Sequence, residues 1–405
     1  MVEGWIKTEL GDKKYFDILG SGIQFFENEK DYLSTSSVID DKIDHVEQRI
    51  TFIKRPSRAN MQPIKNSVWF AKMKETLKVI LIDDKIIKNN ILSTGFCGIK
   101  CIDVSPELLK QFFMSKKFNS KKDLLSEGST QKAINNTKTA TIEITFPESL
   151  PEQQKIADIL TKVDETIEAT EKIIVKDERI KKGLMQDLFS KGIDEKGNLR
   201  SEETHEFKDS ELGRIPKEWD VETLSPNFAK ITTGNKDTQD RNNDGLYPFF
   251  VRSNTIERIN SYSYDGEAIL TSGDGVGVGK IYHYVNCKFD FHQRVYMLYN
   301  FKKDISGKYL FYYFRENFYN EIAKDSAKTT VDSVRLHMIA DMKIPKPKLQ
   351  EQEKIASILS SIDSKIQKEK QELNKLKSIK EGLMQDLLTG NKQKEVTCMI
   401  KEAVV

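Results

Sequence analysis

At 405 residues the chain exceeds one usual domain, and its 38% hydrophobic content is enough to build two or more cores. Because 64 lysines and arginines stand against 62 aspartates and glutamates, the net charge is only +2, so a nucleic-acid surface must come from segregated charge and not from overall basicity. A disulfide framework is excluded because the four cysteines, Cys97, Cys101, Cys287 and Cys398, are too few and too scattered. A membrane span is excluded because no stretch approaches roughly 20 apolar residues, and the start carries no signal-peptide run. These observations predict a cytoplasmic protein.

The first predicted element is a mixed α/β domain over residues 1–148. The apolar run Ile91–Lys100 is broken by Gly95 and Gly98, which indicates a strand, a tight turn and a second strand. An apolar and aromatic helix is expected around Leu108 to Phe113.

A long helix is predicted next, over residues 149–190. Ser149 to Glu152 forms a capping-box pattern with Pro151 just inside the helix start. Apolar residues then alternate steps of four and three, with one polar member, which is typical of a coiled-coil seam. The seam residues are Ile156, Leu160, Val163, Ile167, Thr170 and Ile174, after which the stripe moves to Ile180, Leu184 and Leu188.

The second half of the chain is expected to follow the same plan. The polar, charged stretch 191–217 is predicted to be a linker. A second mixed α/β domain is expected over 218–347, in which Trp219–Leu224 is similar to the segment from Trp5 to Leu10 and Ile269–Lys280 is similar to Ile91–Lys100. A further apolar and aromatic helix is expected around Leu310 to Phe318.

A second long helix is predicted over 348–390, closed by Gly390 and Asn391 and followed by a poorly ordered tail over 391–405. Its stripe has the same spacing as that of the first helix, and its polar member stands at the same place as Thr170. The seam residues are Ile355, Leu359, Ile362, Ile366, Glu369 and Leu373, followed by Ile379, Leu383 and Leu387.

The two long helices are copies of one sequence. Residues Pro151–Phe189 align without a gap with Gln350–Leu388, including the stretches Glu-Gln-x-Lys-Ile-Ala-x-Ile-Leu and Gly-Leu-Met-Gln-Asp-Leu. Matched length and register favour packing of the helices on each other over the alternative of two separate surface helices with ordinary apolar faces. The predicted fold is therefore α+β: two mixed α/β globular domains separated by two long antiparallel helices in a coiled coil, with an internal pseudo-two-fold repeat.

No catalytic, cofactor or metal site can be assigned. The glycine-rich stretch Gly273–Lys280 lacks the spacing of a phosphate-binding loop, since Ile281 follows the lysine where Ser or Thr is needed, and it also lacks the dinucleotide-binding spacing. Cys97 and Cys101 have no second pair of ligands at zinc-site spacing, and His283, Cys287 and His292 are only loosely clustered. Ser225-Pro226-Asn227-Phe228 lacks the second proline of an amino-methyltransferase loop.

The repeated helix sequences resemble the conserved regions of the specificity subunit of type I restriction-modification enzymes. The stretch Ser210–Trp219 is similar to the opening of that family's second target-recognition domain, and Trp69–Lys74 followed by Ser93–Phe96 is similar to one version of the first. The exit of the second domain at Lys343–Pro347 departs slightly from the family's proline-rich approach. The resemblance covers nearly the whole chain.

The resemblance implies a non-catalytic subunit that reads an asymmetric, bipartite site on double-stranded DNA, one half-site per domain, with the helices as spacer. A helix of roughly 35 residues is about 50 Å long, enough to separate modules spaced by one DNA turn of roughly 34–36 Å. The implied partners are two methyltransferase (modification) subunits. Restriction subunits, which translocate and cut DNA, would join the complex through them. S-adenosylmethionine, ATP and magnesium would belong to these partners, so no cofactor is expected in this chain.

Basic and polar side chains are the candidate DNA contacts, since they donate to phosphates and base edges. A non-DNA coiled-coil scaffold and a standalone enzyme are the competing interpretations; the first does not account for duplicated domains with glycine turns, and the second lacks catalytic motifs. The candidate contacts are Lys54, Arg55, Arg58, Lys72 and Lys74 in the first half, and Arg252, Ser253, Asn254, Lys280 and Arg294 in the second.

Overall fold

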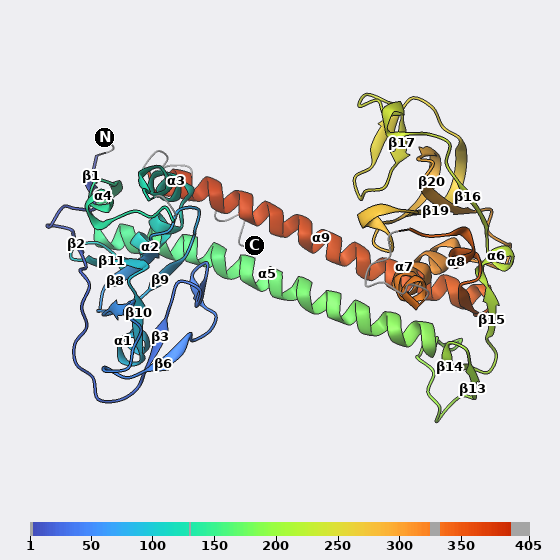
Figure 1. The fold of residues 1–405 in the computed structure, drawn as a ribbon, viewed down its shortest axis with the longest axis horizontal. Helices are drawn as coiled ribbons and strands as arrows, with labels where there is room; N and C mark the ends of the chain where they lie inside the picture. Colours follow the sequence, from blue (N-terminus) through green and yellow to red (C-terminus); the bar gives the residue numbers. More distant parts are fainter. Residues whose placement is uncertain (1–2, 129–130, 325–332, 390–405) are drawn as a thin grey trace. The chain divides into compact units, whose positions relative to one another are not determined.

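The structure is a computed structural model that describes residues 3–128, 131–324 and 333–389, and Figure 1 shows its fold. The chain forms two compact units, the first from Met1–Lys172 with Gln371–Val405 and the second from Ile173–Lys370. Both long helices, α5 (Leu150–Ser190) and α9 (Leu349–Leu387), therefore contribute residues to each unit. The predicted helix closure at Gly390 and Asn391 and the tail 391–405 lie outside the described residues.

The globular part of the first unit contains two four-stranded sheets, in the orders β6-β3-β10-β7 and β2-β11-β8-β9. Its helices are α1 (Asp84–Asn89), α2 (Pro106–Met114), α3 (Lys116–Leu125) and α4 (Asn136–Ala140). Its strands are β1 (Trp5–Glu9), β2 (Phe16–Ile18), β3 (Lys30–Leu33), β4 (Val38–Ile39), β5 (Lys42–Ile43), β6 (Gln48–Ile50), β7 (Ala59–Met61), β8 (Ser67–Ala71), β9 (Val79–Leu81), β10 (Asn90–Ser93), β11 (Phe96–Cys101) and β12 (Glu143–Pro147).

Aromatic side chains from α2 and α3 form the core of the first unit against β8. Ser105 and Ser115 start these helices by accepting hydrogen bonds from the backbone N–H groups two or three residues into each helix. The helices then bring Phe113 and Phe118 to Phe70, with each ring centroid 4.9 Å from the Phe70 centroid. The core continues through residues of both long helices, namely Ile156, Ala157, Leu160, Leu387 and Leu388.

The second unit is built on one six-stranded sheet of order β16-β21-β19-β20-β17-β18. Its shorter helices are α6 (Leu224–Asn227), α7 (Gly307–Lys324) and α8 (Leu336–Ala340), with 3-10 turns η1 (Thr238–Asp240) and η2 (Gly275–Gly277). Its strands are β13 (Phe207–Ser210), β14 (Gly213–Pro216), β15 (Asp220–Thr223), β16 (Lys230–Thr233), β17 (Tyr247–Phe250), β18 (Glu257–Ile259), β19 (Tyr264–Ser272), β20 (Tyr282–Phe291), β21 (Val295–Tyr299) and β22 (Lys343–Lys346).

Helix α7 supplies the core of the second unit. Tyr309, Phe314 and Phe318 are fully buried on its inner face, and Phe189 at the end of α5 packs edge-on against Tyr309 with ring centroids 5.7 Å apart. Ile355 and Leu359 of α9 complete this core. Each long helix therefore supplies apolar side chains to the core of both units.

The stretch 191–217, predicted to be a linker, is more ordered than its composition indicates. It contains the β13–β14 hairpin, and Arg200 within it is buried. The Arg200 guanidinium donates to both carboxylate oxygens of Glu351, at 2.5 and 3.1 Å, and to Glu218 at 2.5 Å. Trp219 Nε1 also donates to Glu351, at 3.2 Å, so the start of α9 holds this stretch in place.

The internal repeat is visible in equivalent hydrogen bonds at the start of each long helix. Gln153 is buried; its Nε2 donates to the Pro147 carbonyl at 2.8 Å and its Oε1 accepts from the Ser105 N–H at 2.8 Å. Gln352, its equivalent in the second copy, donates to the Pro347 carbonyl at 2.8 Å and accepts from the Ser306 N–H at 3.0 Å. The repeated glutamine thus fastens each helix to the strand before it and to the helix of its own domain.

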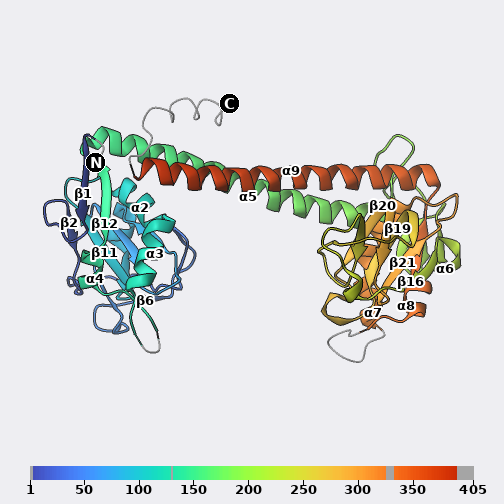
Figure 2. The same cartoon turned by 90° about the horizontal axis from the view of Figure 1, so that it is seen from above.

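In both units the stretches of α5 and α9 run alongside each other in opposite directions (Figure 1, Figure 2). In the first unit, Lys380 lies 2.5 Å from Asp164 and Lys377 lies 2.8 Å from Glu171, so rising numbers on α5 meet falling numbers on α9. In the second unit the ion pairs are Asp177 with Lys365, Glu178 with Lys370, and Lys181 with Asp363. The two stretches therefore pair antiparallel within each unit.

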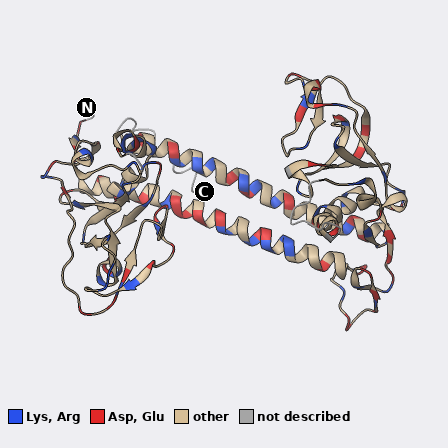
Figure 3. Ribbon diagram, viewed as in Figure 1, with Lys and Arg blue, Asp and Glu red and all other residues tan. Residues whose placement is uncertain are grey.

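These ion pairs follow the repeat. Asp164 and Asp363 occupy equal positions in the two copies, as do Lys380 and Lys181, so the Asp164–Lys380 and Asp363–Lys181 pairs are equivalent. The Glu171–Lys377 and Lys370–Glu178 pairs are also equivalent, but with the charges exchanged: α5 carries both glutamates and α9 both lysines. Figure 3 shows charges of both signs along the two helices.

The predicted seam residues are buried or half-buried, and one residue further along the stripe is exposed. Ile180 is 44% exposed, because Lys181 takes the inward position in order to reach Asp363. Thr170 is buried and donates to the Thr166 carbonyl at 2.9 Å. Of the other predicted seam residues, Ile156, Leu160, Ile174, Ile355, Leu359 and Ile366 are buried, while Val163, Ile167, Ile362, Glu369 and Leu373 are half-buried.

Candidate nucleic-acid interface

In the first unit, two of the predicted basic residues meet at the turn between β10 and β11, which we call the Gly95 turn (Ser93–Phe96). The Thr94 N–H donates to the Arg58 carbonyl at 2.8 Å, and the Lys72 N–H donates to the Gly95 carbonyl at 2.9 Å. The Gly95 N–H turns inward to Ser93 Oγ at 3.1 Å. The fold therefore brings the backbones of Arg58 and Lys72 to one tight turn.

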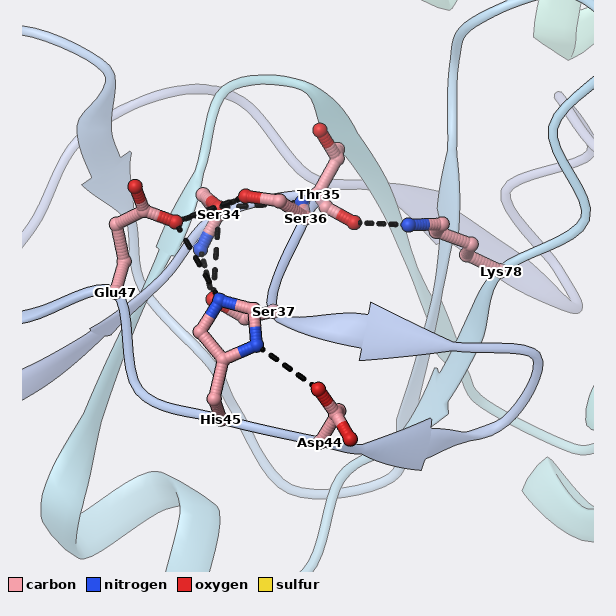
Figure 4. Close-up of polar contacts among 8 residues, drawn as sticks. All are labelled: Ser34, Thr35, Ser36, Ser37, Asp44, His45, Glu47 and Lys78. Atoms are coloured by element: carbon pink, nitrogen blue, oxygen red, sulfur yellow. Dashed lines mark hydrogen bonds and ion pairs between the residues drawn. The ribbon is translucent and has the colours of Figure 1, made fainter. Parts of the chain in front are cut away.

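A serine-rich loop, Ser34–Ser37, lies against the Gly95 turn and was not identified from the sequence. Figure 4 shows the hydroxyls of Ser34 and Ser36 both directed at Glu47, at 2.8 Å each. Thr35 Cγ2 lies 2.9 Å from the position that a Cβ at Gly95 would take, so a larger residue at Gly95 would have to displace the Thr35 side chain. Because each hydroxyl donates its one proton to Glu47, its oxygen is left as an acceptor.

The serine-rich loop is not arranged for hydrolysis. A nucleophilic serine needs an adjacent general base, most often a histidine, as its direct hydrogen-bond partner. Here Ser34 and Ser36 donate to Glu47, which lowers the pKa of that carboxyl, and His45 Nε2 lies 3.8 Å from the same carboxylate (Figure 4). Lys78 Nζ donates to the Thr35 carbonyl at 2.6 Å and holds the loop in place.

The remaining predicted residues of the first unit lie elsewhere. Arg55 is half-buried over the Phe52 ring, 4.6 Å from its centroid, and donates to the Phe52 carbonyl. Lys54 is exposed in the same loop between β6 and β7. Lys74 is half-buried and pairs with Glu75 at 3.2 Å. Of these three, only Lys54 is fully presented to solvent.

In the second unit, two predicted arginines meet at the turn after β19, which we call the Gly273 turn (Gly273–Gly277). Arg252 Nη1 donates to Asp274 Oδ1 at 2.7 Å, and Arg294 Nη1 donates to Asp274 Oδ2 at 2.5 Å. Burial opposes ionisation of Asp274, but the hydrogen bonds from the two arginines outweigh it and lower the pKa of this carboxyl. One carboxylate thus joins two cations from distant parts of the sequence.

The other predicted residues of the second unit are Ser253, Asn254 and Lys280, of which Lys280 contacts the same turn through its backbone. The Ser253 carbonyl lies 3.1 Å from His283 Nε2, and burial lowers the pKa of His283, which favours the neutral ring. Asn254 and Lys280 are exposed, and the Lys280 N–H donates to the Gly277 carbonyl at 3.1 Å.

Gln293, next to Arg294, is a further polar candidate that was not identified from the sequence. Its side chain is exposed and donates to Asp237 Oδ2 at 2.8 Å, while its N–H donates to the Lys236 carbonyl at 2.8 Å. Glutamine is a common partner of adenine edges. Neither Asp237 nor Asp274 carries a recognisable signal in the sequence, because their partners are distant along the chain.

The two cysteines that were considered as metal ligands lie in the core of the first unit. Cys97 and Cys101 are buried and free, and burial raises the pKa of the Cys97 thiol to about 12. No group of three or more His, Cys, Asp or Glu side chains in the described ranges is placed to hold a metal ion. None of the described helices combines the length and the apolar character that a membrane crossing requires.

Comparison with known proteins relates the chain to restriction-modification specificity subunits. The type I restriction enzyme EcoDI specificity subunit of Escherichia coli is 29% identical over 185 residues, which are 46% of this chain and 40% of that protein. The MjaVIII specificity subunit of Methanocaldococcus jannaschii is 28% identical over 271 residues, 62% of each chain. The matched regions therefore span less than two thirds of either relative.

Solved structures with the same fold extend over most of the chain. The S subunit of a type I restriction-modification system from M. genitalium has a TM-score of 0.61 at 16% identity and covers 95% of this chain and 96% of its own. A second structure, from work on complex assembly and conformational transition of the type I R-M system, has a TM-score of 0.59 at 18% identity and covers 96% and 99%. At these identities the likeness concerns the fold.

The family model described as "Type I restriction modification DNA specificity domain" matches the chain twice, over residues 23–178 and 216–378. Each match includes most of one globular domain and most of the long helix that follows it, so the repeat read from the sequence coincides with the two matches. Together they cover well over half of the chain. The protein therefore belongs to the family of the type I restriction modification DNA specificity domain.

Proposed function

We propose that this chain is the non-catalytic DNA-specificity subunit of a type I restriction-modification complex. The observation that carries the proposal is the duplication: two copies of the specificity domain, each with its own glycine turn and its own basic residues. Two different domains in one chain are suited to two different half-sites, and hence to an asymmetric, bipartite target on double-stranded DNA. Such a subunit would act in the cytoplasm.

The candidate contacts are divided between the two turns. In the first domain Arg58 and Lys72, together with the serine-rich loop, would face one half-site, and Lys54 would contact phosphates nearby. In the second domain Arg252, Ser253, Asn254, Lys280 and Arg294, to which Gln293 is now added, would face the other. Arg55 and Lys74 become weaker candidates, because their side chains already have partners within the chain.

The long helices would act as the spacer and as the docking surface for partners. With 41 and 39 residues, α5 and α9 are each about 60 Å long. Two modification subunits would bind this chain, and restriction subunits would join through them. Methyl transfer, ATP-driven translocation and cleavage would then belong to those partners, together with S-adenosylmethionine, ATP and magnesium.

Methylome sequencing of the host tests the proposal. We expect methylated adenines or cytosines in a bipartite motif with two unrelated half-sites, and loss of this motif when the gene is deleted. A salt-titrated gel shift of the chain with its modification subunits should show affinity falling steeply as salt rises, because phosphate contacts release counterions. Absence of DNA binding by the complex, together with absence of a methylated bipartite motif, would favour the non-DNA coiled-coil scaffold instead.

A further inference from the structure

We propose that Arg252 and Arg294 read guanine in the second half-site and that Asp274 positions both guanidinium groups for this task. The inference deepens the proposed function and depends on it. It adds a base, a pair of reading residues and a positioning residue to one of the two half-sites.

The geometry is that of a shared support. Asp274 is largely buried, with 17% of its side chain exposed, whereas the side chains of Arg252 and Arg294 are 43% and 62% exposed. Each arginine donates to Asp274 through Nη1, and within the described part of the chain the Nε and Nη2 groups of both make no hydrogen bond. The carboxylate thus fixes one side of each guanidinium and leaves the other side presented to solvent.

The backbone around the turn is held equally firmly. The Gly273 N–H donates to the Arg294 carbonyl at 2.8 Å, and a Cβ at Gly273 would lie 2.9 Å from that oxygen. A Cβ at Gly277 would lie 2.3 Å from Ile281 Cδ1 and 3.3 Å from the Arg252 carbonyl. The glycines therefore allow the turn to sit directly against the backbones of both arginines.

Guanine is the base that this arrangement matches. Its O6 and N7 atoms are two adjacent acceptors in the major groove, and they accept both hydrogen bonds from one edge of an arginine. A guanidinium whose rotamer is already fixed loses less conformational entropy on binding. A site that served only to attract phosphate would gain nothing from the carboxylate, because its charge reduces the attraction for the DNA backbone.

The first domain gives an internal contrast. At the Gly95 turn, Phe96 occupies the position that follows the turn glycine, where the second domain has Asp274. Phe96 is fully buried and cannot support a guanidinium. The proposal therefore concerns the second half-site alone.

Base analogues test the inference with the wild-type chain in complex with its modification subunits. Each guanine of the second half-site is replaced in turn by 7-deazaguanine, which lacks the N7 acceptor. We expect about a tenfold loss of affinity at one or two positions. A second half-site without a G·C pair, or one that tolerates every 7-deazaguanine, overturns the proposal.

Arginine variants assign the contacts. Arg252→Ala and Arg294→Ala should each lower affinity about tenfold and should then show no further loss with 7-deazaguanine at the matching position. Arg241→Ala, which removes an exposed arginine paired with Glu257 at 3.5 Å, is the matched control and should still show the loss. If both arginine variants keep the wild-type response to 7-deazaguanine, these residues do not read the base.

Asp274→Asn distinguishes guanine reading from phosphate binding by the sign of its effect. Removal of a negative charge beside two arginines should tighten a phosphate contact, whereas loss of the support should weaken binding about tenfold and relax discrimination at the guanine. Tighter binding therefore overturns the proposal.

If thermal denaturation shows that this variant does not fold, the base-analogue experiment decides alone. A wild-type complex that binds no specific sequence would refute the proposed function itself, which is a different result.

Discussion

At the scale of single residues, a buried glutamine at the start of each long helix makes a specific prediction. We expect Gln153→Ala to lower the free energy of unfolding of the first unit by about 3 kcal/mol, because a buried N–H and a buried carbonyl both lose their partner. Gln154→Ala removes an exposed neighbour whose amide donates to Asp158 at 2.9 Å, and should cost under about 0.5 kcal/mol. Chemical denaturation of the intact chain measures both; equal losses would contradict this role.

Asp274 makes a prediction about pH. Its pKa is lower in the folded protein than its ordinary value of 3.8, so its ionised form stabilises the folded state. This contribution is fully present above the ordinary value and is lost as the pH falls through the lowered pKa. The difference in melting temperature between wild type and Asp274→Asn should therefore be constant above about pH 5 and shrink towards pH 3. A difference that grows on acidification would show that the sign is wrong.

The sequence could suggest individual contact residues but not their partners. Arg252 and Arg294 were candidates because arginine donates to base edges, yet Asp274 was identified only as part of a turn. The fold joins these three residues from three separate segments, and no periodicity or spacing records such a meeting. The same holds for Ser34 and Glu47, whose contact depends on how two strands are connected.

At the scale of elements, helical periodicity predicted which side chains of α5 and α9 share one face, because residues three and four positions apart lie on the same side of a helix. Most of these side chains are buried or half-buried. Ile180 was misplaced since its apolar character suggests burial, whereas Lys181 can reach inward with its long chain and find Asp363. The hairpin in 191–217 was missed for a similar reason: a polar, charged composition hides the buried Arg200 that holds it to Glu351.

The exchanged ion pairs of the long helices make a prediction at this scale. Glu178→Lys places a like charge against Lys370 and should lower the stability of the second unit by about 0.5 to 1 kcal/mol, since both side chains are about half exposed. Adding Lys370→Glu restores an opposite pair with reversed polarity and should recover the loss. A double-mutant cycle by thermal or chemical denaturation gives the coupling. A coupling near zero would mean that this pair contributes nothing to pairing.

At the scale of the whole molecule, the duplication was readable from the sequence because thirty-nine residues align without a gap between Pro151–Phe189 and Gln350–Leu388. The α/β domains were predictable only as a class. Their strand orders are set by contacts between distant segments, such as the parallel pairing of β3 with β10 and of β17 with β20.

The proposed spacer role makes a prediction for the complete complex. Deleting one heptad from each long helix, at positions that face each other, shortens both by about 10 Å. Since one base pair of B-DNA rises about 3.4 Å, the unread gap in the methylated target should shorten by about three base pairs, while both half-sites stay the same. Methylome sequencing of a host carrying the variant reads this directly. An unchanged gap would exclude the helices as the spacer.

The charges on the helix pair also make the two halves of the chain chemically distinguishable. A homotypic pair of two α5 helices would set Glu171 against Glu178 and leave the buried Asp177 facing Thr166 in place of Lys365. A homotypic pair of two α9 helices would set Lys370 against Lys377. Opposite charges meet at all of these ion-pair positions only when one α5 helix pairs with one α9 helix. An ancestor made of two identical halves could therefore not have been held together by the same ion pairs.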